Sequence, residues 1–572
     1  MQTRWAKKID VKKCFSEYPR MHMQRDSYTC LNGIWQYEIT SKDGQPGSNY
    51  QNILVPFPVG SPLSNALEVL KDDEVLWYRK RFSYRRTNER TILHFEAVDQ
   101  KCVVYLNNVE VGMHSGGYLP FSMDVTRFLQ DENVLIVAVS DRSDKGIYAY
   151  GKQKLEAEKI WYKPTAGIWG TVWLEDVCER HIEDIKITPL FDDASVFIQL
   201  FGDFEQAVIT VRDNGQDVFK DIVKDKQILL KFDQFKAWTP DNPFLYDVYI
   251  ETADDYIKSY FGMRKFSKGK DRHGHVRFML NNKPLFLTGL LDQGYNCDGL
   301  YTYPSDEAMI YELQTVKEMG FNMLRKHVKI ENHRWYYHCD RLGILVMQDM
   351  VNGGNDYDMS LVQYKGYLGF KVKDDDYAAF GRDNEKSRSA FEKELFGMIN
   401  HLYNHPCIFS WVIFNEGWGQ FDSLYWVDRV KEIDQTRLID HASGWFDQKG
   451  GDFKSRHVYF GPYIHLKDRQ GRIEILSEFG GYAYREYGHS LSDKVFGYKK
   501  FKEKLKLGKA IYNLYDNQIR KAVEKGLGGC IYTQLSDVET EMNGLFTYDR
   551  EILKVEKRMM NRINRKLIRM VK

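Results

Sequence analysis

Hydrophobic and polar positions alternate with a period of two through most of the first half of the chain. From about residue 28 to 180, short β-branched and aromatic runs such as 91–98 and 134–139 are separated by turn residues. Such alternation places apolar side chains on one face of a strand, so this region is predicted to be an all-β sandwich. Asn107-Asn108 is predicted to form a hairpin turn, because asparagine tolerates the positive φ that such turns need.

The same alternation continues from residue 182 to about 265. It comprises about seven short runs, among them 196–200 and 207–211, which is the number of strands in a small immunoglobulin-like sandwich. The proline-rich segment 238–246 is predicted to turn into one of the last strands.

The pattern changes after Gly289, where apolar runs alternate with amphipathic helical stretches. One predicted helix covers 305–319, with Ser305 as its N-cap, and another covers 508–525. Eight strands with helices between them over about 290 residues are the count and size of a (β/α)8 barrel. The predicted strands are 286–291, 321–325, 345–348, 408–414, 438–441, 457–460, 475–478 and 529–534.

These patterns divide the chain into three predicted domains, which cover residues 1–181, 182–266 and 267–572. A polar stretch at 351–385 follows the third predicted barrel strand. It is too long for an ordinary connection, so it is expected to be either a functional lid or disordered.

Composition narrows the class of partner. Lys and Arg number 81 against 80 Asp and Glu, so no long-range field attracts nucleic acid or an anionic membrane. A neutral or weakly charged small substrate fits better. The aromatic content of 14% suits stacking on sugar rings, and it suits the filling of β-sandwich cores equally well.

The first residues contain no apolar core of a signal peptide, and no stretch approaches the about 18 apolar residues of a transmembrane helix. A cytoplasmic protein is therefore expected. The eight cysteines are scattered without a C-x-x-C pair, which predicts reduced thiols rather than a disulfide framework or a zinc site.

Two glutamates carry the chemistry that the barrel pattern predicts. Catalytic groups of a (β/α)8 barrel lie at the carboxyl ends of its strands, where Glu416 follows the fourth predicted strand and Glu478 ends the seventh. These strands lie nearly opposite each other, so the two carboxylates can converge on one bond. Carboxyl groups about 5 to 5.5 Å apart allow one to attack a sugar while the other donates a proton, and about 6.5 to 9.5 Å leaves room for water and inversion.

The segment 404–416, Asn-His-Pro-Cys-Ile-Phe-Ser-Trp-Val-Ile-Phe-Asn-Glu, resembles the acid/base signature of glycoside hydrolase family 2, and Glu478 matches the nucleophile position. The resemblance covers nearly the whole chain, with Leu31-Asn-Gly-Ile-Trp-Gln in a jelly-roll sugar-binding domain and Gly262-Met-Arg in the immunoglobulin-like domain. It implies a retaining exo-β-glycosidase that works by double displacement through a covalent glycosyl-enzyme, with no cofactor and no metal in the chemistry.

The resemblance also implies roles for individual residues. Glu416 is similar to the general acid/base and Glu478 to the nucleophile, whereas Asn415 matches the residue that binds the sugar 2-hydroxyl and Tyr459 the one that orients the nucleophile. By their strand-end positions, a further group is expected to contact substrate or else to hold the barrel rim: His327, Asp292, Asp349, His441 and Gln534. Trp418 and Trp445 could stack on a sugar or aglycone, or pack against their own loops.

Two departures from the family pattern bear on specificity. Family β-glucuronidases present Asn-x-Lys to the substrate carboxylate where this chain has Glu541-Met-Asn543, which disfavours a uronate. Glu539 and Glu541 themselves are expected to be solvated charges near the mouth. The magnesium ligands and the histidine-rich segment of the large β-galactosidases have no clear counterpart.

The sequence therefore predicts hydrolysis of a terminal neutral β-linked sugar, with a β-galactosidase as the first choice. β-Glucuronidase, β-mannosidase and α-L-arabinosidase remain alternatives of the same family. A transglycosidase or a catalytically inactive carbohydrate-binding protein would share the scaffold. The expected partner is an oligosaccharide or glycoside, with neither nucleic acid nor membrane, and the two β domains could serve homo-oligomerisation.

Overall fold

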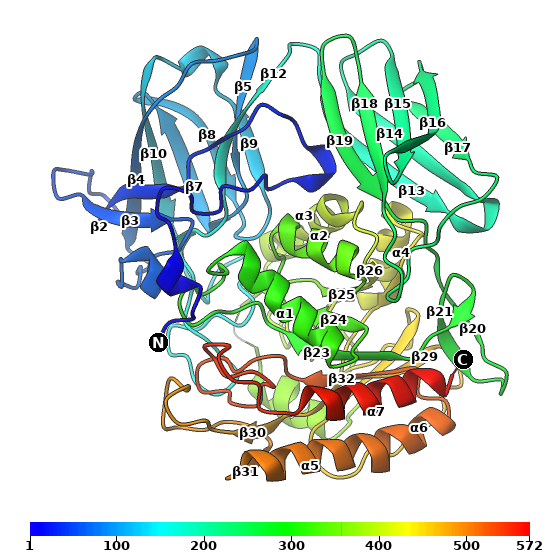
Figure 1. Cartoon of the computed structure of the whole chain (residues 1–572). Coiled ribbons are helices and arrows are strands. Elements are labelled where there is room, and N and C mark those ends of the chain that lie inside the picture. Colours follow the sequence, from blue (N-terminus) through cyan, green and yellow to red (C-terminus); the bar gives the residue numbers. More distant parts are fainter. Residues whose placement is uncertain (356, 572) are drawn as a thin grey trace.

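The computed structural model describes residues 1–355 and 357–571. Two β-sandwiches lie side by side above a barrel, with the N-terminal sandwich over one side and the second sandwich over the other (Figure 1). The predicted fold class, a jelly-roll-like sandwich, an immunoglobulin-like sandwich and a (β/α)8 barrel in this order, is confirmed.

The N-terminal sandwich packs a six-stranded sheet against a four-stranded one, with a two-stranded pair beside them. Asn107 and Asn108 have φ of 52° and 68°, so the predicted hairpin turn is confirmed. In sheet order the strands are β3 (Gln51–Val55), β2 (Gly33–Ser41), β4 (Glu74–Ser83), β10 (Glu132–Ser140), β7 (Lys101–Leu106) and β8 (Val109–Ser115); then β1 (Thr29–Cys30), β12 (Val172–Val177), β5 (Arg90–Phe95) and β9 (Phe121–Asp124); then β11 (Gly167–Ile168) and β6 (Val98–Asp99).

The second sandwich has a three-stranded and a four-stranded antiparallel sheet, which matches the seven strands expected. Inward positions such as Ile198, Ile209 and Val248 are fully buried, whereas Phe197, Val208 and Tyr249 beside them are only half-buried. The strands are β13 (Ile182–Leu190), β14 (Ser195–Gly202) and β17 (Gln227–Lys231), facing β16 (Gln216–Val223), β15 (Ala207–Asp213), β18 (Tyr246–Glu251) and β19 (Tyr256–Phe261).

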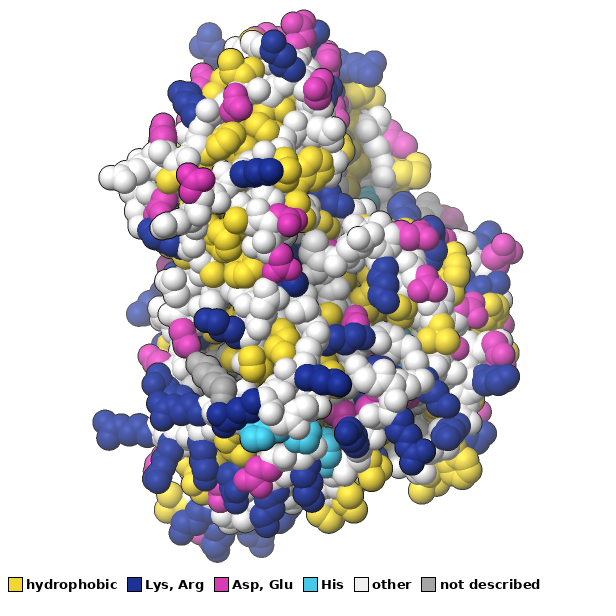
Figure 2. Space-filling model, turned by 90° about the vertical axis from the view of Figure 1, so that its right-hand side faces the viewer, with side chains coloured by type: hydrophobic (Ala, Val, Ile, Leu, Met, Phe, Trp, Pro, Cys, Tyr) yellow, Lys and Arg dark blue, Asp and Glu magenta, His cyan; other side chains and the backbone are white. Residues whose placement is uncertain are grey.

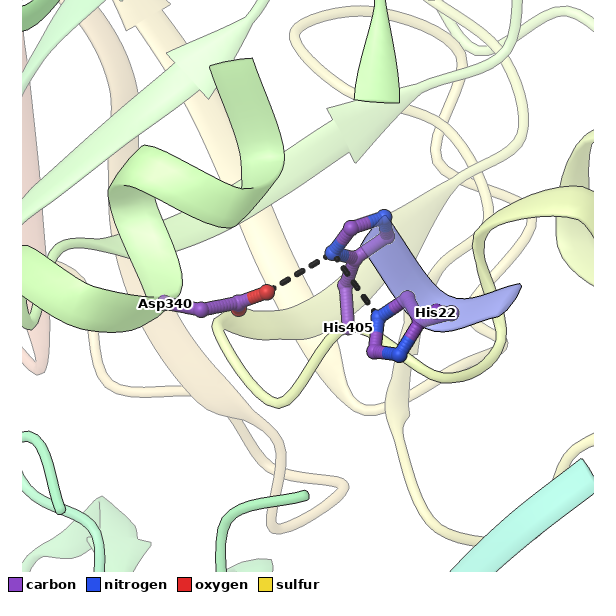
Figure 3. A group of neighbouring side chains, drawn as sticks. All are labelled: His22, Asp340 and His405. Atoms are coloured by element: carbon purple, nitrogen blue, oxygen red, sulfur yellow. Dashed lines mark hydrogen bonds and ion pairs between the residues drawn. The ribbon is translucent and has the colours of Figure 1, made fainter. Parts of the chain in front are cut away.

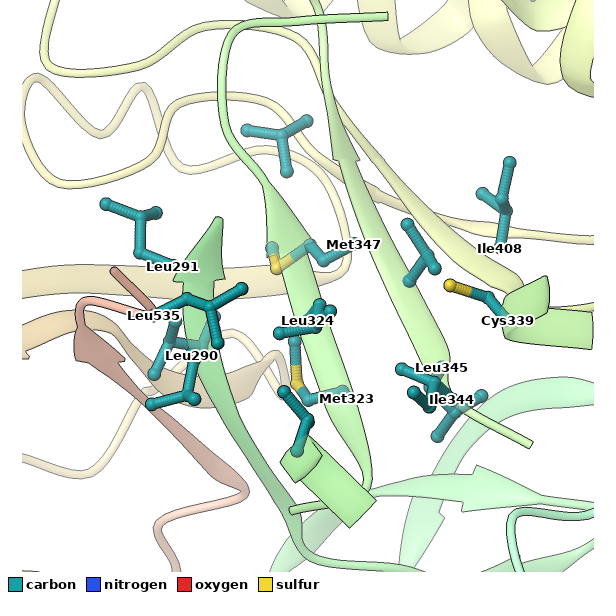
Figure 4. Close-up of a cluster of buried hydrophobic side chains, with 14 of the residues drawn as sticks. Leu290, Leu291, Met323, Leu324, Cys339, Ile344, Leu345, Met347, Ile408 and Leu535 are labelled. Carbon is teal, nitrogen blue, oxygen red and sulfur yellow. The ribbon is translucent and has the colours of Figure 1, made fainter. Parts of the chain in front are cut away.

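The barrel is one eight-stranded parallel sheet whose two end strands meet, because the Asp452 N–H donates to the Ile439 carbonyl at 2.7 Å. Strands such as 287–292, 345–349 and 408–412 are covered on both faces, and every residue in them is buried. Figure 4 shows apolar side chains of neighbouring barrel strands, among them Leu290, Met323 and Leu345, gathered in one buried cluster. In sheet order the strands are β27 (Leu438–Asp440), β26 (Ile408–Val412), β25 (Leu345–Asp349), β24 (Met323–Lys326), β23 (Leu287–Asp292), β32 (Gly529–Thr533), β29 (Ile473–Gly480) and β28 (Phe453–Val458).

Helices surround the barrel, and the first three of them begin at side-chain N-caps. The Ser305 side chain accepts from Ala308 N–H, as predicted for this cap, and Asn332 and Asn384 cap the next two helices. The helices are α1 (Asp306–Glu318), α2 (His333–Leu342), α3 (Glu385–Leu402), α4 (Ser423–Ile433), α5 (Lys504–Leu514), α6 (Arg520–Glu524) and α7 (Lys557–Arg569), with π-helices at η6 (Ser360–Lys365) and η7 (Tyr515–Ile519). Two small sheets, β20 (Phe266–Lys270) with β21 (Val276–Leu280) and β22 (Lys283–Pro284), and β30 (Tyr482–Tyr484) with β31 (Lys499–Phe501), complete the fold.

The sixth barrel strand differs from its prediction. It spans Phe453–Val458 and not 457–460, because Lys454, Ser455 and Arg456 interrupt the apolar pattern while Phe453, Ser455 and His457 still turn inward. The predicted polar loop 351–385 also differs, apart from Asp356, which lies outside the described residues. It contains η6, and its Leu361, Val362 and Phe380 are buried.

Acidic and basic side chains are interspersed over the face in Figure 2, with Lys and Arg denser over its lower part. None of the described helices combines the length and apolar composition that a membrane span requires.

Candidate active site

Glu416 lies in a tight loop just after β26. Its φ is 50°, in the left-handed region that non-glycine residues seldom adopt. The Glu416 N–H donates to the Ser443 carbonyl at 2.8 Å, and the Ser443 N–H donates to the Phe414 carbonyl at 2.8 Å. A backbone held in this way against its preference is found most often where a side chain must be aimed for function.

Glu478 lies inside β29 and is buried. The register with β32 shifts between Leu476 and Phe479, and such bulges re-aim side chains next to active sites. The Tyr459 hydroxyl donates to Glu478 Oε2, and Arg325 Nη1 donates to Glu478 Oε1 at 3.2 Å. Tyr459 itself is fixed by Tyr498, whose ring stacks on it at 3.7 Å between centroids.

One oxygen of Glu416 and one of Glu478 lie within 4.8 Å of each other, and a ring nitrogen of His457 lies within the same distance of both. An approach this close is compatible with the about 5 to 5.5 Å between the carboxyl groups of retaining glycosidases.

Two residues that contact the candidate catalytic glutamates, His457 and Arg325, were not predicted from the sequence. His457 Nδ1 lies 2.6 Å from Glu416 Oε1, and its Nε2 lies 3.5 Å from Glu478 Oε1. Arg325 on β24 donates to Glu478, to Asn415 Oδ1 at 2.8 Å and to Asp349 Oδ1 at 2.9 Å. For His457 the available signal was the period of two on β28, where Phe453, Ser455 and His457 turn inward.

The electrostatic field keeps Glu478 ionised. Burial raises the pKa of this carboxyl, but electrostatic interactions with His457, His327, Arg325 and Lys152 outweigh burial and lower the pKa to about 2. Burial and the adjacent carboxylate raise the pKa of the Tyr459 hydroxyl well above its usual value, so it stays a proton donor.

Asn415, His327 and Asp349 meet beside this pair. Asp349 Oδ2 lies 2.8 Å from His327 Nδ1, and burial lowers the pKa of His327 well below its usual value. The neutral ring that donates from Nδ1 leaves Nε2 as an acceptor. The Asn415 Nδ2 group is buried without a hydrogen-bond partner among the described residues, so it is a donor ready for a ligand.

Asp292 and His441 lie outside this convergence. The Asp292 carboxylate accepts from Gly294 N–H at 2.8 Å and from Lys326 Nζ at 2.7 Å, so both oxygens are bound by the protein. His441 Nε2 accepts from the Gln448 N–H at 3.1 Å and holds its own loop.

Gln534 belongs to a closed ring of hydrogen bonds. Gln293 Nε2 donates to Gln534 Oε1 at 2.6 Å and to Glu541 Oε2 at 3.0 Å. Gln534 Nε2 donates to Asn543 Oδ1 at 2.9 Å, and Asn543 Nδ2 donates to Glu541 Oε1 at 3.0 Å. Glu541 and Glu539 are 2% and 6% exposed, so the expectation that both are solvated surface charges is wrong. The loop after β32 folds inward and buries them among amides and tyrosines.

Trp418 and Trp445 are buried in a cluster at the barrel mouth. Trp445 lies 5.4 Å from the His457 ring and 4.9 Å from Tyr367 of the segment after η6, between ring centroids. Trp418 packs at 5.3 Å against Trp161 of the N-terminal sandwich. The two tryptophans thus join three chain segments around the site.

Two clusters of described residues gather three atoms that could bind a metal ion. One is Glu416, His457 and Glu478, and the other is His22, Asp340 and His405. In the second cluster, shown in Figure 3, His405 Nδ1 lies 2.7 Å from Asp340 Oδ2 and 3.3 Å from His22 Nε2. In both groups His nitrogens lie within hydrogen-bond distance of a carboxylate oxygen, His457 of Glu416 and His405 of Asp340.

Comparison with protein families gives three consecutive matches. The family model described as "Glycosyl hydrolases family 2, TIM barrel domain" matches residues 274–565. The models described as "Glycosyl hydrolases family 2, sugar binding domain" and "Glycosyl hydrolases family 2" match residues 21–176 and 180–264. The order is that of the barrel and the two sandwiches in the structure.

Individual relatives are distant. A β-galactosidase of Thermoanaerobacter pseudethanolicus is 26% identical over 391 residues, 64% of this chain and 48% of that protein. A β-glucuronidase of Streptococcus agalactiae is 25% identical over 435 residues, 70% of this chain and 68% of that protein. The chain spans less than half the length of several curated relatives that it matches.

A solved structure of a β-glucuronidase from an uncultured Clostridium species superposes with a TM-score of 0.75 at 20% identity, covering 96% of this chain and 99% of that one. At this identity the likeness establishes the fold and leaves the substrate open.

Proposed function

Since the chain belongs to glycosyl hydrolase family 2, we propose that it is a retaining exo-β-glycosidase in which Glu478 is the nucleophile and Glu416 the general acid/base. The observation that carries the proposal is the approach of the two carboxylates to within 4.8 Å. Membership in a family of β-glycosidases supports the reaction class, and the geometry supports the stereochemical course.

In the first step, ionised Glu478 attacks the anomeric carbon as Glu416 protonates the leaving oxygen, giving a glycosyl-enzyme ester and a free alcohol. The Tyr459 and Arg325 hydrogen bonds orient the attacking carboxylate. Both donors also keep it anionic before attack.

In the second step, Glu416 acts as a base and removes a proton from water, which attacks the anomeric carbon and releases Glu478 with net retention. His457 contacts both carboxylates, so it is suited to hold Glu416 in place through both steps.

Asn415 is proposed to bind the sugar 2-hydroxyl. Its Nδ2 group lacks a partner, while Arg325 fixes its Oδ1 end at 2.8 Å. A hydrogen bond at this hydroxyl strengthens as the oxocarbenium ion develops, so it contributes mainly to the rate. His327, with Nε2 as an acceptor, is proposed to bind a second hydroxyl.

We propose a terminal neutral β-linked sugar as substrate, with a galactoside first. The Asn-x-Lys positions of the β-glucuronidases read Glu541-Met542-Asn543 here, and Glu541 is buried where a uronate would need a cation. The relative from Thermoanaerobacter pseudethanolicus is named a β-galactosidase.

A panel of p-nitrophenyl glycosides tests the substrate, and the nucleophile is tested separately. Glu478→Ala should abolish nearly all turnover, and azide should rescue it as a glycosyl azide of opposite anomeric configuration. Glu416→Ala is the matched variant, since its azide product should keep the configuration of the substrate. Normal turnover by Glu478→Ala would remove this residue from the role.

A further inference from the structure

A lysine of the N-terminal sandwich reaches into the barrel site. Lys152 lies in the connection between β10 and β11, yet its side chain is almost fully buried at 4% exposure. Its Nζ lies 5.7 Å from the ring centroid of Trp418. Its charge acts on three barrel residues that project from different strands or loops, Glu478, His327 and Glu541.

The backbone on both sides of Lys152 is clamped. The Tyr150 and Gly151 N–H groups donate to the Asn352 carbonyl at 3.0 and 3.1 Å, and Asn352 Nδ2 donates back to the Gly151 carbonyl at 2.9 Å. Gly151 has φ of +65°, and a Cβ there would lie 3.0 Å from the Val328 carbonyl oxygen. The close approach of two domains at a glycine therefore fixes where Lys152 enters.

The ammonium group itself has no direct partner among the described residues. It donates no hydrogen bond to them, and no carboxylate oxygen lies within the 4.0 Å of an ion pair. Its Nζ keeps some contact with solvent, so its N–H groups are free to donate to a bound acceptor. The position is thus built for a ligand atom.

Beside Glu541, the Gln293 amide also lacks one hydrogen-bond partner, and this atom is an acceptor rather than a donor. Gln293 Nε2 is committed to Gln534 and Glu541, which fixes the orientation of its amide. The Gln293 Oε1 atom is left buried with no hydrogen-bond partner in the described structure. The Gln293 Oε1 atom can accept a hydrogen bond from a ligand, and each Glu541 oxygen can accept one more.

We propose that Lys152, with Glu541 and Gln293, binds a hydroxyl of the terminal sugar and excludes a carboxylate at that position. A hydroxyl can accept from Lys152 Nζ and donate to Glu541 or Gln293, so it satisfies both the donor and the acceptors. A carboxylate satisfies only the lysine and faces the acceptors of Glu541 and Gln293. The proposal rests on the proposed β-glycosidase function and assigns its specificity to a residue outside the barrel.

The test compares wild type with Lys152→Met, which keeps the side-chain length without the charge. Lys154→Met is the control, because Lys154 lies in the same segment but its Nζ faces Asp144 at 3.6 Å. Substrates are p-nitrophenyl β-galactoside, its analogues that each lack one hydroxyl, and p-nitrophenyl β-galacturonide. Lys152→Met should lower kcat/KM for p-nitrophenyl β-galactoside about 10- to 100-fold. For the one deoxy analogue that lacks the hydroxyl bound by Lys152, it should leave kcat/KM nearly unchanged.

Equal losses on every deoxy analogue would mean that Lys152 acts only on the charge of Glu478, and the proposal would be overturned. Preference of the wild type for the galacturonide would overturn it too, since Lys152 would then bind a carboxylate. Lys152→Gln gives a second uncharged variant should the methionine impair folding.

Binding of free sugars tests the role of Lys152 independently of the proposed hydrolysis. D-Galactose should raise the Tm of the wild type and of Lys154→Met more than D-galacturonate does, and Lys152→Met should lose this effect. That result would support hydroxyl binding even if no glycoside were turned over and the proposed hydrolysis failed. A wild type stabilised by neither sugar, or more by galacturonate, would overturn the assignment.

Discussion

His457 Nδ1 lies 2.6 Å from Glu416 Oε1. The other nitrogen of the same ring lies 3.5 Å from Glu478 Oε1 and 3.1 Å from Ser443 Oγ. One imidazole thus contacts both candidate catalytic carboxylates, and Ser443 and Arg325 fix its second nitrogen.

We expect His457→Gln to lower kcat about 10- to 100-fold with little change in KM, because one ring nitrogen holds Glu416 and the other is taken up by Ser443 and Arg325. The loss should be larger for alkyl glycosides than for dinitrophenyl glycosides, since only poor leaving groups need a well-placed acid. Steady-state kinetics over a leaving-group series measures this. An equal loss across the series would mean that His457 acts through the nucleophile Glu478 and not through the acid Glu416.

The pKa of about 2 for Glu478 predicts the acid side of the pH profile. The carboxylate stays ionised well below the about 4.3 of a free glutamate, so kcat/KM should not fall with protonation of Glu478 until the pH approaches 2. In Lys152→Met one positive group is lost, the pKa rises toward its ordinary value, and the acid limb should move to higher pH. Lys154→Met should leave the limb in place, and an unmoved limb in Lys152→Met would contradict the electrostatic account.

A buried histidine cluster predicts the pH dependence of stability. His22 of η2 (Met21–Met23), His333 and His401 surround His405 where the N-terminal segment meets α2 and α3. Burial lowers the pKa of His22 and His333 well below the usual value, and that of His401 to about 3.

Because the folded state keeps these rings neutral, the unfolded state binds more protons once the pH falls below about 6.5, and stability decreases from there toward the folded pKa values. Each ring contributes up to about 1.4 kcal/mol per pH unit. Urea unfolding from pH 7 to pH 5 should show this slope, and His401→Asn should reduce it. His273→Gln, at an exposed site, should not change it.

Exposed aromatic side chains at the barrel mouth predict an aglycone preference. Tyr367 and Phe460 are 41% and 64% exposed, and their ring centroids lie 6.0 Å apart. Phe460 directly follows Tyr459, which donates to the nucleophile. We expect Phe460→Ala to raise KM for aryl glycosides about 3- to 10-fold and to leave methyl glycosides nearly unchanged. KM measured for aryl and methyl glycosides with the wild type and the variant checks this. Equal effects on both series would mean that Phe460 supports the structure of the site and does not bind the aglycone.

The sequence alone predicted the architecture, because the hydropathy pattern of consecutive residues shows which of them are buried. Period-two alternation marked the sandwich strands, Asn107-Asn108 marked a turn, and Ser305 marked the start of α1. It also predicted candidate catalytic residues near the carboxyl ends of opposite barrel strands, Glu416 and Glu478, although β26 ends before Glu416 and β29 continues past Glu478.

Only the tertiary structure decided how these groups meet. The ring of Gln293, Gln534, Glu541 and Asn543 depends on a loop that folds inward, and Lys152 enters from another domain. Hydrogen bonds and charge interactions act through space over a few ångströms, whereas the hydropathy pattern reports only whether each position is buried. The pattern therefore fixes the scaffold, and packing between distant segments decides which polar groups share the site.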